Sequence, residues 1–358
     1  MDSDTLATAP PPSIDLDPER IEFGRVFVPL WLTSRYSGGS WEEPRIERIG
    51  NIDLHPAAIV FHYGQAIFEG LKAYKWADGS VHLFRPEENA RRLNRSAERM
   101  AMPTLDEKVF VEGIRDLVGR QRAWIPEFPG SLYIRPTMIG TEPCIGVRPS
   151  NEFLFFVLTL PSGAYFPKSA GATGTQTVSV YVTTRVGRAA PGGTGNVKAA
   201  ANYAVTLKVI GEAKKKGCAQ VLFLDARGRG HIEEMGGMNV FFVSGRKLVT
   251  PHLYDTILPG VTRDSILRLA PELGFEALEG DVPLDALIAQ IEKGEVTEAF
   301  ACGTAAVIAG IDSFVLDDGR VISVGSGKCG PVTETLCHHL IDIQYGERPD
   351  PFGWVVGV

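Results

Sequence analysis

A single lysine follows a glycine-rich stretch and precedes a run of small residues that favour a helix. Residues 192–203 read GGTGNVKAAANY, with Lys198 at the junction. Glycine lets the backbone approach a ligand closely, and the small residues after the lysine leave room for a flat molecule. A lone lysine is usually a surface charge, but this setting favours an amine that does chemistry.

Two phosphate-binding loops share this glycine content and are excluded. A Walker loop requires Gly-Lys-Ser or Gly-Lys-Thr, whereas Lys198 follows Val197 and precedes Ala199. The dinucleotide-binding pattern requires a third glycine where Lys198 stands. The remaining hypothesis is a lysine that forms a Schiff base with pyridoxal phosphate (PLP).

PLP requires an acidic group that keeps its ring nitrogen protonated. Glu233 and Glu234 lie in segment 228–239, which we predict to be a turn between strands. Such a pair is more often solvated surface. Beside a pyridinium, however, the charged carboxylate is favoured and the ring becomes a stronger electron sink.

PLP also requires a site for its phosphate group. Val261 and Thr262 open a predicted helix, and N–H groups at a helix start attract anions. Thr304 lies in a second turn of small residues, and Arg92 offers a positive charge. Each signal is weak alone, and it is their combination with Lys198 that favours PLP.

Helices and strands must hold these residues in place. Strand-like runs occur at 57–62, 152–160, 220–225, 238–244 and the start of 298–311, and helical periodicity at 86–100, 199–216, 261–270 and 284–293. The mixture indicates α/β or α+β domains and leaves the topology open.

Two domains are expected behind an N-terminal tail. Residues 1–20, acidic and proline-rich, suit neither a signal nor a transit peptide and are interpreted as a mobile tail. A small α/β domain is expected over 21–167 and a Gly/Ser/Thr-rich linker over 168–178. The large C-terminal domain over 179–358 is the expected PLP-binding domain.

Composition excludes several classes of protein. The 358 residues are 44% hydrophobic and carry a net charge of −7, which argues against a nucleic-acid partner. The short basic run Lys214-Lys215-Lys216 precedes Gly217 and is interpreted as the end of a helix. No apolar run is long enough to span a membrane. The five cysteines form no CxxC pair, so they suggest neither a zinc site nor a disulfide framework and favour a cytoplasmic location.

An ordered series of motifs resembles the branched-chain amino-acid aminotransferase family. It comprises residues 61–74 (FHYGQAIFEGLKAY), 132–136 (LYIRP), the lysine stretch, 234–239 (EMGGMN) and 258–263 (LPGVTR), between Phe23-Gly24 and 344–346. The resemblance covers nearly the whole chain outside the tail. It implies PLP fold type IV, with two α/β domains and the cofactor at their interface.

The resemblance also implies roles for residues around the cofactor. Lys198 would form the Schiff base and move a proton between the substrate Cα and the cofactor C4′. Glu234 would partner the pyridine nitrogen, Tyr203 would donate to the 3′ oxygen, and Arg188 would lie nearby. Phosphate binding would fall to Arg92, Val261, Thr262 and Thr304.

Substrate-binding residues follow from the same resemblance. Thr304 and Ala305, aided by Tyr63, would bind the α-carboxylate, and Arg135 suits the second carboxylate of glutamate. The side-chain pocket would comprise Phe23, Phe68, Tyr133 and Tyr203, although core packing is the commoner role of such aromatics. Ile145 and Val147 would reach in from a second subunit, which implies a homodimer with shared active sites.

The implied activity is reversible ping-pong amino transfer between L-leucine, L-isoleucine or L-valine and 2-oxoglutarate. D-amino-acid aminotransferases and aminodeoxychorismate lyases share the fold but are shorter and lack the 61–74 stretch. A non-catalytic binder of an anionic metabolite, using the helix start at Val261, is the alternative from another class.

Two departures from the family pattern stand out. Residues 28–31 read VPLW where many relatives have Thr-Asp-His, so the entrance near Phe23 is expected to differ. Ala306 and Ala309 stand where animal relatives have a CxxC pair, so no thiol regulation of that kind is expected.

Overall fold

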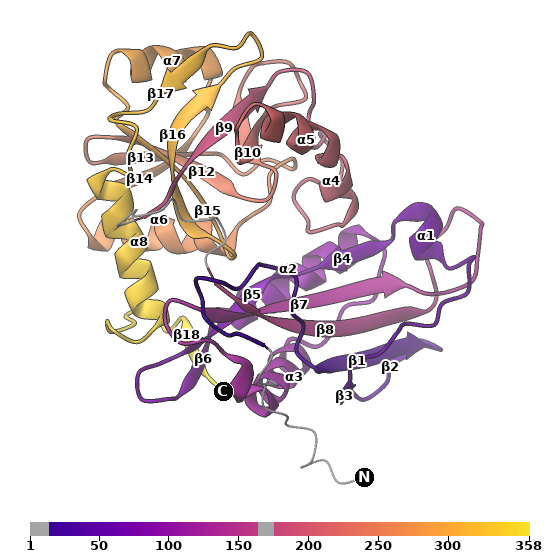
Figure 1. The fold of residues 1–358 in the computed structure, drawn as a ribbon. Coiled ribbons are helices and arrows are strands. Elements are labelled where there is room, and N and C mark those ends of the chain that lie inside the picture. The colour runs from indigo at the N-terminus through magenta and orange to yellow at the C-terminus, as the bar shows by residue number, and fades with distance from the viewer. Residues whose placement is uncertain (1–13, 164–174) are drawn as a thin grey trace. The chain divides into compact units, whose positions relative to one another are not determined.

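The computed structural model describes residues 14–163 and 175–358, and its contacts divide the chain into two compact units (Figure 1). The first unit comprises residues 1–167, 198–200 and 342–358, and the second comprises 168–197 and 201–341. Lys198 and the C-terminal segment therefore group with the first unit, whereas the sequence predicted one domain over 179–358.

The structure describes only part of the predicted N-terminal tail and of the predicted linker. Of the expected tail, residues 1–13 lie outside the described residues, but Ile14 packs against the hydrophobic core of the first unit. The expected linker over 168–178 lies mostly outside them too, and its last two residues belong to strand β9.

An antiparallel sheet forms the first unit, in the order β18-β6-β5-β7-β8-β1-β2, with β3 beside β1 and β4 beside β7. The strands are β1 (Leu30–Ser37), β2 (Ser40–Trp41), β3 (Arg45–Arg48), β4 (Ala66–Phe68), β5 (Leu71–Lys75), β6 (Val81–Phe84), β7 (Ser131–Gly140), β8 (Phe153–Ser162) and β18 (Val355–Gly357). The strand predicted over 152–160 is confirmed as β8.

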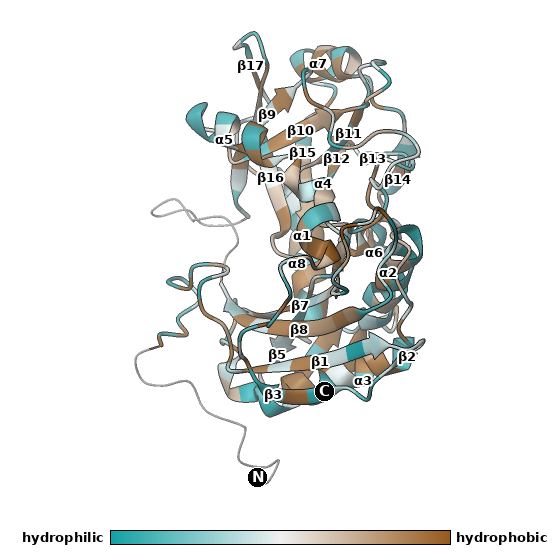
Figure 2. Cartoon of the chain, turned by 90° about the vertical axis from the view of Figure 1, so that its right-hand side faces the viewer, coloured by the Kyte–Doolittle hydropathy of each residue, from teal (hydrophilic) through white to brown (hydrophobic). Residues whose placement is uncertain are grey.

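Alternate residues of β8 enter two different hydrophobic clusters. Phe153, Phe155 and Val157 join the core that contains residues of α2 (Pro86–Arg99) and α3 (Glu107–Arg120), whereas Leu154 and Phe156 face the opposite side. Alternate side chains of β8 are therefore buried on opposite faces of the sheet. Figure 2 accordingly colours much of β8 as hydrophobic.

Helix α2 confirms the helix predicted over 86–100. Pro86 occupies its first turn, Glu87 and Glu88 follow, and Arg99 lies in the last turn, an arrangement that suits the helix dipole. Leu93 and Ala97 on its inner face are buried in the core, and Met100 packs against that core partly buried.

The strand predicted over 57–62 is wrong. Residues Ile59–Tyr63 form the short helix α1, which Gly64 ends in the left-handed conformation with a φ of 61°. A short apolar run does not by itself distinguish a strand from a buried helical turn. Residues Arg122–Trp124 form a 3₁₀ helix after α3.

A mixed sheet forms the second unit, in the order β11-β10-β9-β16-β15-β12-β13-β14, with β17 beside β16. Its strands are β9 (Thr177–Thr183), β10 (Gln220–Leu224), β11 (Ile232–Met235), β12 (Asn239–Ser244), β13 (Lys247–Pro251), β14 (Glu276–Gly280), β15 (Glu298–Gly303), β16 (Val307–Val315) and β17 (Val321–Ser323). Its helices are α4 (Ala201–Ala204), α5 (Leu207–Lys215), α6 (Val261–Glu272), α7 (Leu284–Glu292) and α8 (Pro331–Gln344), whose last residues belong to the first unit.

Most predicted elements of this unit are confirmed, with two corrections. The helix expected over 199–216 is interrupted, because the Thr206 N–H and hydroxyl both bond the carbonyl of Tyr203. Leu207, an apolar residue within the predicted helix, is 68% exposed. Glu233 and Glu234 lie in strand β11 and are buried, not in a turn.

No helix in the described part of the chain is long and apolar enough to cross a membrane.

Candidate active site

Lys198 lies in a turn that is anchored to the first unit. Its N–H donates to Oγ of Ser96 on α2 at 3.0 Å, and its carbonyl accepts from the N–H of Phe68 at 3.1 Å. Ala199 forms a β-bridge with Ile67. The backbone on both sides of the side chain is therefore held in place by β4 and α2.

Ring contacts connect Lys198 to the predicted substrate-binding residues of the same unit. The Lys198 Nζ lies 4.9 Å from the ring centroid of Phe68, and the Arg135 guanidinium carbon lies 4.7 Å from it. Arg135 Nη2 also donates to the Tyr133 hydroxyl at 2.9 Å, and Phe23 packs edge-on against Tyr133 at 5.0 Å. The structure thus brings five predicted residues together.

Arg92, a predicted phosphate-binding residue, forms an ion pair with Glu69 in which both side chains are buried. Asn89 Nδ2 donates to the same carboxylate at 2.7 Å. Burial alone would raise the pKa of Glu69, but the charge and hydrogen bonds of Arg92, with smaller effects of Lys198 and Asn89, hold this pKa below its usual value. Glu69 was missed by sequence reasoning, although an acid within the apolar run Ile67–Gly70 was a signal for a buried carboxylate.

Tyr63, Ile145 and Val147 form a separate group on the first unit. The Tyr63 hydroxyl donates to the carbonyl of Ile145, and the side chains of Ile145 and Val147 are 66% and 87% exposed. The loop that carries them is closed by Arg148, whose Nη1 and Nη2 donate to Glu142 at 2.9 and 2.6 Å. Two apolar residues are therefore presented on a well-braced loop.

In the second unit, Glu234 forms a buried ion pair with Arg188. The N–H of Leu258 donates to Glu234 Oε1 at 2.9 Å. Arg188 also donates to the carbonyls of Gly195 and Thr256, at 2.8 and 2.7 Å. These interactions fix the position of the Glu234 carboxylate. A fixed carboxylate is what the predicted partner of the pyridine nitrogen requires.

The N-terminus of α6 lies beside this carboxylate network. Asn239 Nδ2 donates to the carbonyl of Leu258 at 3.0 Å and to Glu234 Oε2 at 3.4 Å. A Cβ on Gly260, the N-cap of α6, would overlap Asn239 Oδ1, so this position requires glycine. Val261 and Thr262 follow as the first helical residues.

In the second unit, Tyr203 lies beside Gly237, and the turn of Thr304 and Ala305 starts beside Met238. A Cβ on Gly237 would lie 3.6 Å from Tyr203 Cε1, and a Cβ on Gly303 would lie 3.5 Å from Cγ of Met238. The pairing of Asn239 with Cys302 between β12 and β15 sets this proximity.

Each unit by itself carries groups of the kind that PLP needs. The first unit supplies an amine held by its backbone and a buried guanidinium, and the second supplies a buried carboxylate and the start of a twelve-residue helix. These are the groups that a Schiff base, an anionic phosphate and a pyridinium need. In the described residues no group of His, Cys, Asp and Glu side chains is arranged to hold a metal ion.

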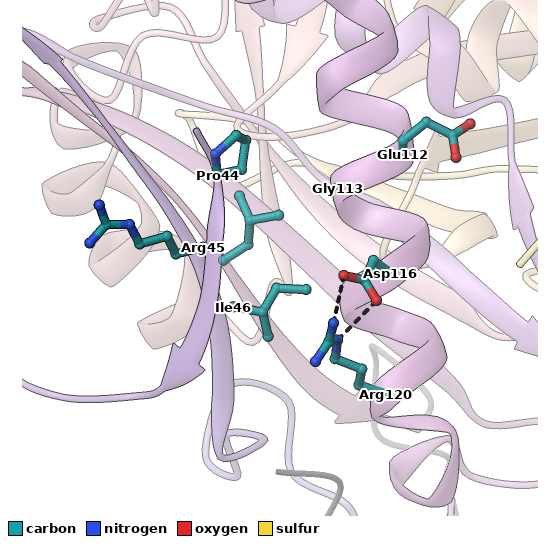
Figure 3. A pocket seen from close by; sticks show the side chains of 8 residues that line it. Pro44, Arg45, Ile46, Glu112, Gly113, Asp116 and Arg120 are labelled. Carbon is teal, nitrogen blue, oxygen red and sulfur yellow. Dashed lines mark hydrogen bonds and ion pairs between the residues drawn. The ribbon is translucent and has the colours of Figure 1, made fainter. Parts of the chain in front are cut away.

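A pocket of about 640 Å³ elsewhere in the first unit contains none of these residues (Figure 3). Residues of β1, β3 and α3 line it, among them Leu32, Ile46, Asp116 and Arg120. Arg120 donates from Nε and Nη2 to Asp116 at 2.9 and 3.1 Å. Asp116 and Arg120 thus neutralise each other, and we assign this pocket no catalytic role.

Comparison with known proteins identifies close relatives. The family model for amino-transferase class IV matches residues 66–314. The branched-chain-amino-acid aminotransferase of Mycolicibacterium smegmatis is 45% identical over 340 residues, 93% of this chain and 91% of that protein. The crystal structure of the Escherichia coli branched-chain amino acid aminotransferase has a TM-score of 0.74 at 31% identity and covers 87% of this chain and 96% of its own. The branched-chain amino acid aminotransferase of T.th., complexed with N-(5′-phosphopyridoxyl)-L-glutamate, has a TM-score of 0.71 at 25% identity and covers 90% and 97%.

Proposed function

The chain belongs to the class IV aminotransferases and, among them, to the branched-chain-amino-acid aminotransferases of fold type IV, and on this premise we propose its substrates, cofactor and site. It transfers an amino group reversibly between L-leucine, L-isoleucine or L-valine and 2-oxoglutarate, with PLP as cofactor. The observation that carries this proposal is the continuous contact from Lys198 through Phe68 to Arg135 and Tyr133.

Lys198 is the catalytic residue of this proposal. When bound, PLP supplies an aldehyde that condenses with amines and a ring that accepts the electron pair released at the substrate Cα. With PLP bound, the Lys198 amine would be the group that takes the proton from the substrate Cα and returns it during amino transfer. The hydrogen bonds of its backbone to Ser96 and Phe68 keep the amine within reach during both transfers.

The remaining residues bind and orient. Glu234, held by Arg188, keeps the ring nitrogen protonated, and Tyr203 donates to the 3′ oxygen. Arg92, Val261, Thr262 and Thr304 bind the phosphate, while Thr304, Ala305 and Tyr63 bind the α-carboxylate. Phe23, Phe68 and Tyr133 surround the side chain, and Arg135 binds the second carboxylate of glutamate through its planar donors.

A homodimer with shared active sites belongs to the same proposal. Exposed Ile145 and Val147 on a braced loop, with Phe61 62% exposed on α1, form an apolar surface that suits a second copy of this chain. Five cysteines without a disulfide support a reducing, cytoplasmic location.

The experiment uses Lys198→Ala beside Lys208→Ala, a change at an exposed lysine of α5. Single half-reactions with L-leucine, L-glutamate and D-alanine are followed with the PLP-loaded proteins. The wild type and Lys208→Ala are expected to react with both L-amino acids and not with D-alanine. Lys198→Ala is expected to lose amino transfer, and wild-type rates in this variant would refute the proposed role.

A further inference from the structure

Glu233 is a second buried carboxylate on strand β11, directly before the proposed partner of the pyridine nitrogen. Glu233 is 5% exposed and Glu234 is 3% exposed. Neighbouring residues of a strand point to opposite faces of the sheet, so the two carboxylates do not share one face. Any role of Glu233 in the proposed reaction therefore acts through other residues of the second unit.

Thr256 connects Glu233 to the residues that hold Glu234. The Thr256 hydroxyl donates to Oε1 of Glu233, and the Thr256 carbonyl accepts from Arg188 Nη2 at 2.7 Å. Arg188 in turn forms the buried ion pair with Glu234. The two carboxylates of β11 are therefore linked through one threonine and one guanidinium.

The second carboxylate oxygen of Glu233 favours a protonated acid. Among the described residues, Oε2 of Glu233 is buried and has no hydrogen-bond partner. An ionised carboxylate that loses its hydration is costly unless donors or a cation replace the water. Burial accordingly raises the pKa of Glu233, against the opposing effects of the Thr256 hydroxyl and the Arg188 charge.

The charges of this network change when a cation lies beside Glu234. Arg188 and Glu234 contribute one positive and one negative charge, so an ionised Glu233 leaves an excess of one negative charge. A protonated pyridine nitrogen opposite Glu234 would add one positive charge, which an ionised Glu233 would balance. Because charges interact strongly where water is excluded, the added positive charge favours the loss of the proton from Glu233.

Other charged groups near Glu233 are paired with one another. Asp225 accepts hydrogen bonds from Arg229 Nε at 3.2 Å and from the N–H groups of Arg229 and His231. Burial would raise the pKa of Asp225, but these bonds hold it below its usual value. His231 Nδ1 lies 3.7 Å from Oδ1 of Asp281.

The elements beside β11 add few further charges. Strands β10 and β12 carry no charged side chain, and Lys247 of β13 pairs with Glu276. Asp255, next to Thr256, accepts from the Gly192 N–H at 2.6 Å. A substitution of Glu233 leaves all these groups in place, so their protons cancel when the wild type is compared with a variant at this position.

We infer that Glu233 is a positioning residue that acts through Thr256 and Arg188 on Glu234, and that it releases its proton to solvent when a protonated pyridine nitrogen binds at Glu234. This inference rests on the proposed function. It explains why a second acid is buried beside the first on the opposite face of the strand.

The test counts the protons that are exchanged when PLP binds. The apo proteins are titrated with PLP by calorimetry in buffers of different ionisation enthalpy, from about pH 5 to about pH 8. Wild type is compared with Glu233→Gln, which has the shape of the protonated acid but cannot ionise. Glu212→Gln is the matched control, at an acid of α5 that pairs with the exposed Arg185.

Within this range the wild type is expected to release up to about one proton more than Glu233→Gln. Its affinity for PLP relative to this variant should rise about tenfold between the two ends of the range, as proton release requires. Glu212→Gln should match the wild type. Thr256→Val, which removes a donor to the ionised form, should shift the release to higher pH.

Equal proton counts in the wild type and Glu233→Gln at every pH would overturn the inference, even if the affinity for PLP differs, because a merely structural role changes affinity without changing the proton count. If Glu233→Gln does not fold, an unshifted release in Thr256→Val overturns the inference. A wild type that does not bind PLP would instead overturn the proposed function.

Discussion

Both oxygens of the Glu69 carboxylate accept hydrogen bonds from the Arg92 guanidinium, which donates from Nε at 2.7 Å and from Nη2 at 2.8 Å. Glu69 is 0% exposed and Arg92 is 4% exposed. One turn after Arg92 on the same helix, Ser96 accepts the hydrogen bond of the Lys198 backbone. The helix that orients the guanidinium therefore also orients the lysine.

Replacement of Glu69 tests this coupling. Glu69→Gln removes the counter-charge of a buried guanidinium, so the free energy of unfolding should fall by about 3 kcal/mol. Glu112→Gln, which breaks the exposed pair with Arg115, should change it by less than about 1 kcal/mol. Denaturant unfolding of the two variants measures the difference.

The same variant should also bind PLP more weakly, because Arg92 loses the partner that fixes its orientation. Equilibrium titration of the apo proteins with PLP measures this. Wild-type affinity in Glu69→Gln would show that the ion pair serves stability alone.

Gly70→Ala should disturb the proposed substrate pocket without unfolding the first unit. The new Cβ would overlap the Tyr133 hydroxyl, so the ring must move and its bond with Arg135 must break. We expect KM for glutamate to rise about tenfold, the effect of about 1.4 kcal/mol. Gly211→Ala, on α5 with nothing within 4 Å, should leave KM unchanged and stabilise the helix by up to about 1 kcal/mol.

Lys72 should make the stability of the protein depend on pH in the alkaline range. Burial lowers its pKa to about 8 from the 10.5 of an exposed lysine. Between these values the unfolded chain binds more protons than the folded chain, so the free energy of unfolding rises with pH. The free energy of unfolding of the wild type, relative to that of Lys72→Met, should therefore rise by about 3 kcal/mol from below pH 8 to above pH 10.5. A constant difference across this range would mean that Lys72 titrates as an exposed amine.

Val147→Asp should weaken the proposed dimer. The side chain is 87% exposed on the loop closed by Arg148 and Glu142, so a charge there would enter the apolar interface. Sedimentation of this variant should give a species of half the wild-type mass. Circular dichroism should show that this species remains folded. Val321→Asp, at a 59% exposed valine of β17, should leave the mass unchanged. An unaltered mass in Val147→Asp would exclude this loop from the interface.

Local chemistry in the sequence was sufficient for much of the secondary structure. Pro86 with two following glutamates set the start of α2, and the left-handed Gly217, with a φ of 77°, follows α5. The proposal of Lys198 as the catalytic lysine likewise came from residues adjacent in the chain, namely its glycine-rich approach. Such signals need only neighbouring residues, so a single sequence carries them.

Only the tertiary structure decided which distant residues meet. Glu69 lies 23 positions before Arg92, and Lys72 meets Tyr133 through the register of β5 on β7. Lys198 groups with the first unit because Ser96 and Phe68 bind its backbone, although residues 168–197 before it and 201–341 after Ala200 belong to the second. The physical reason is that register, burial and ion pairing depend on the whole packed chain, whereas propensity depends on a few adjacent residues.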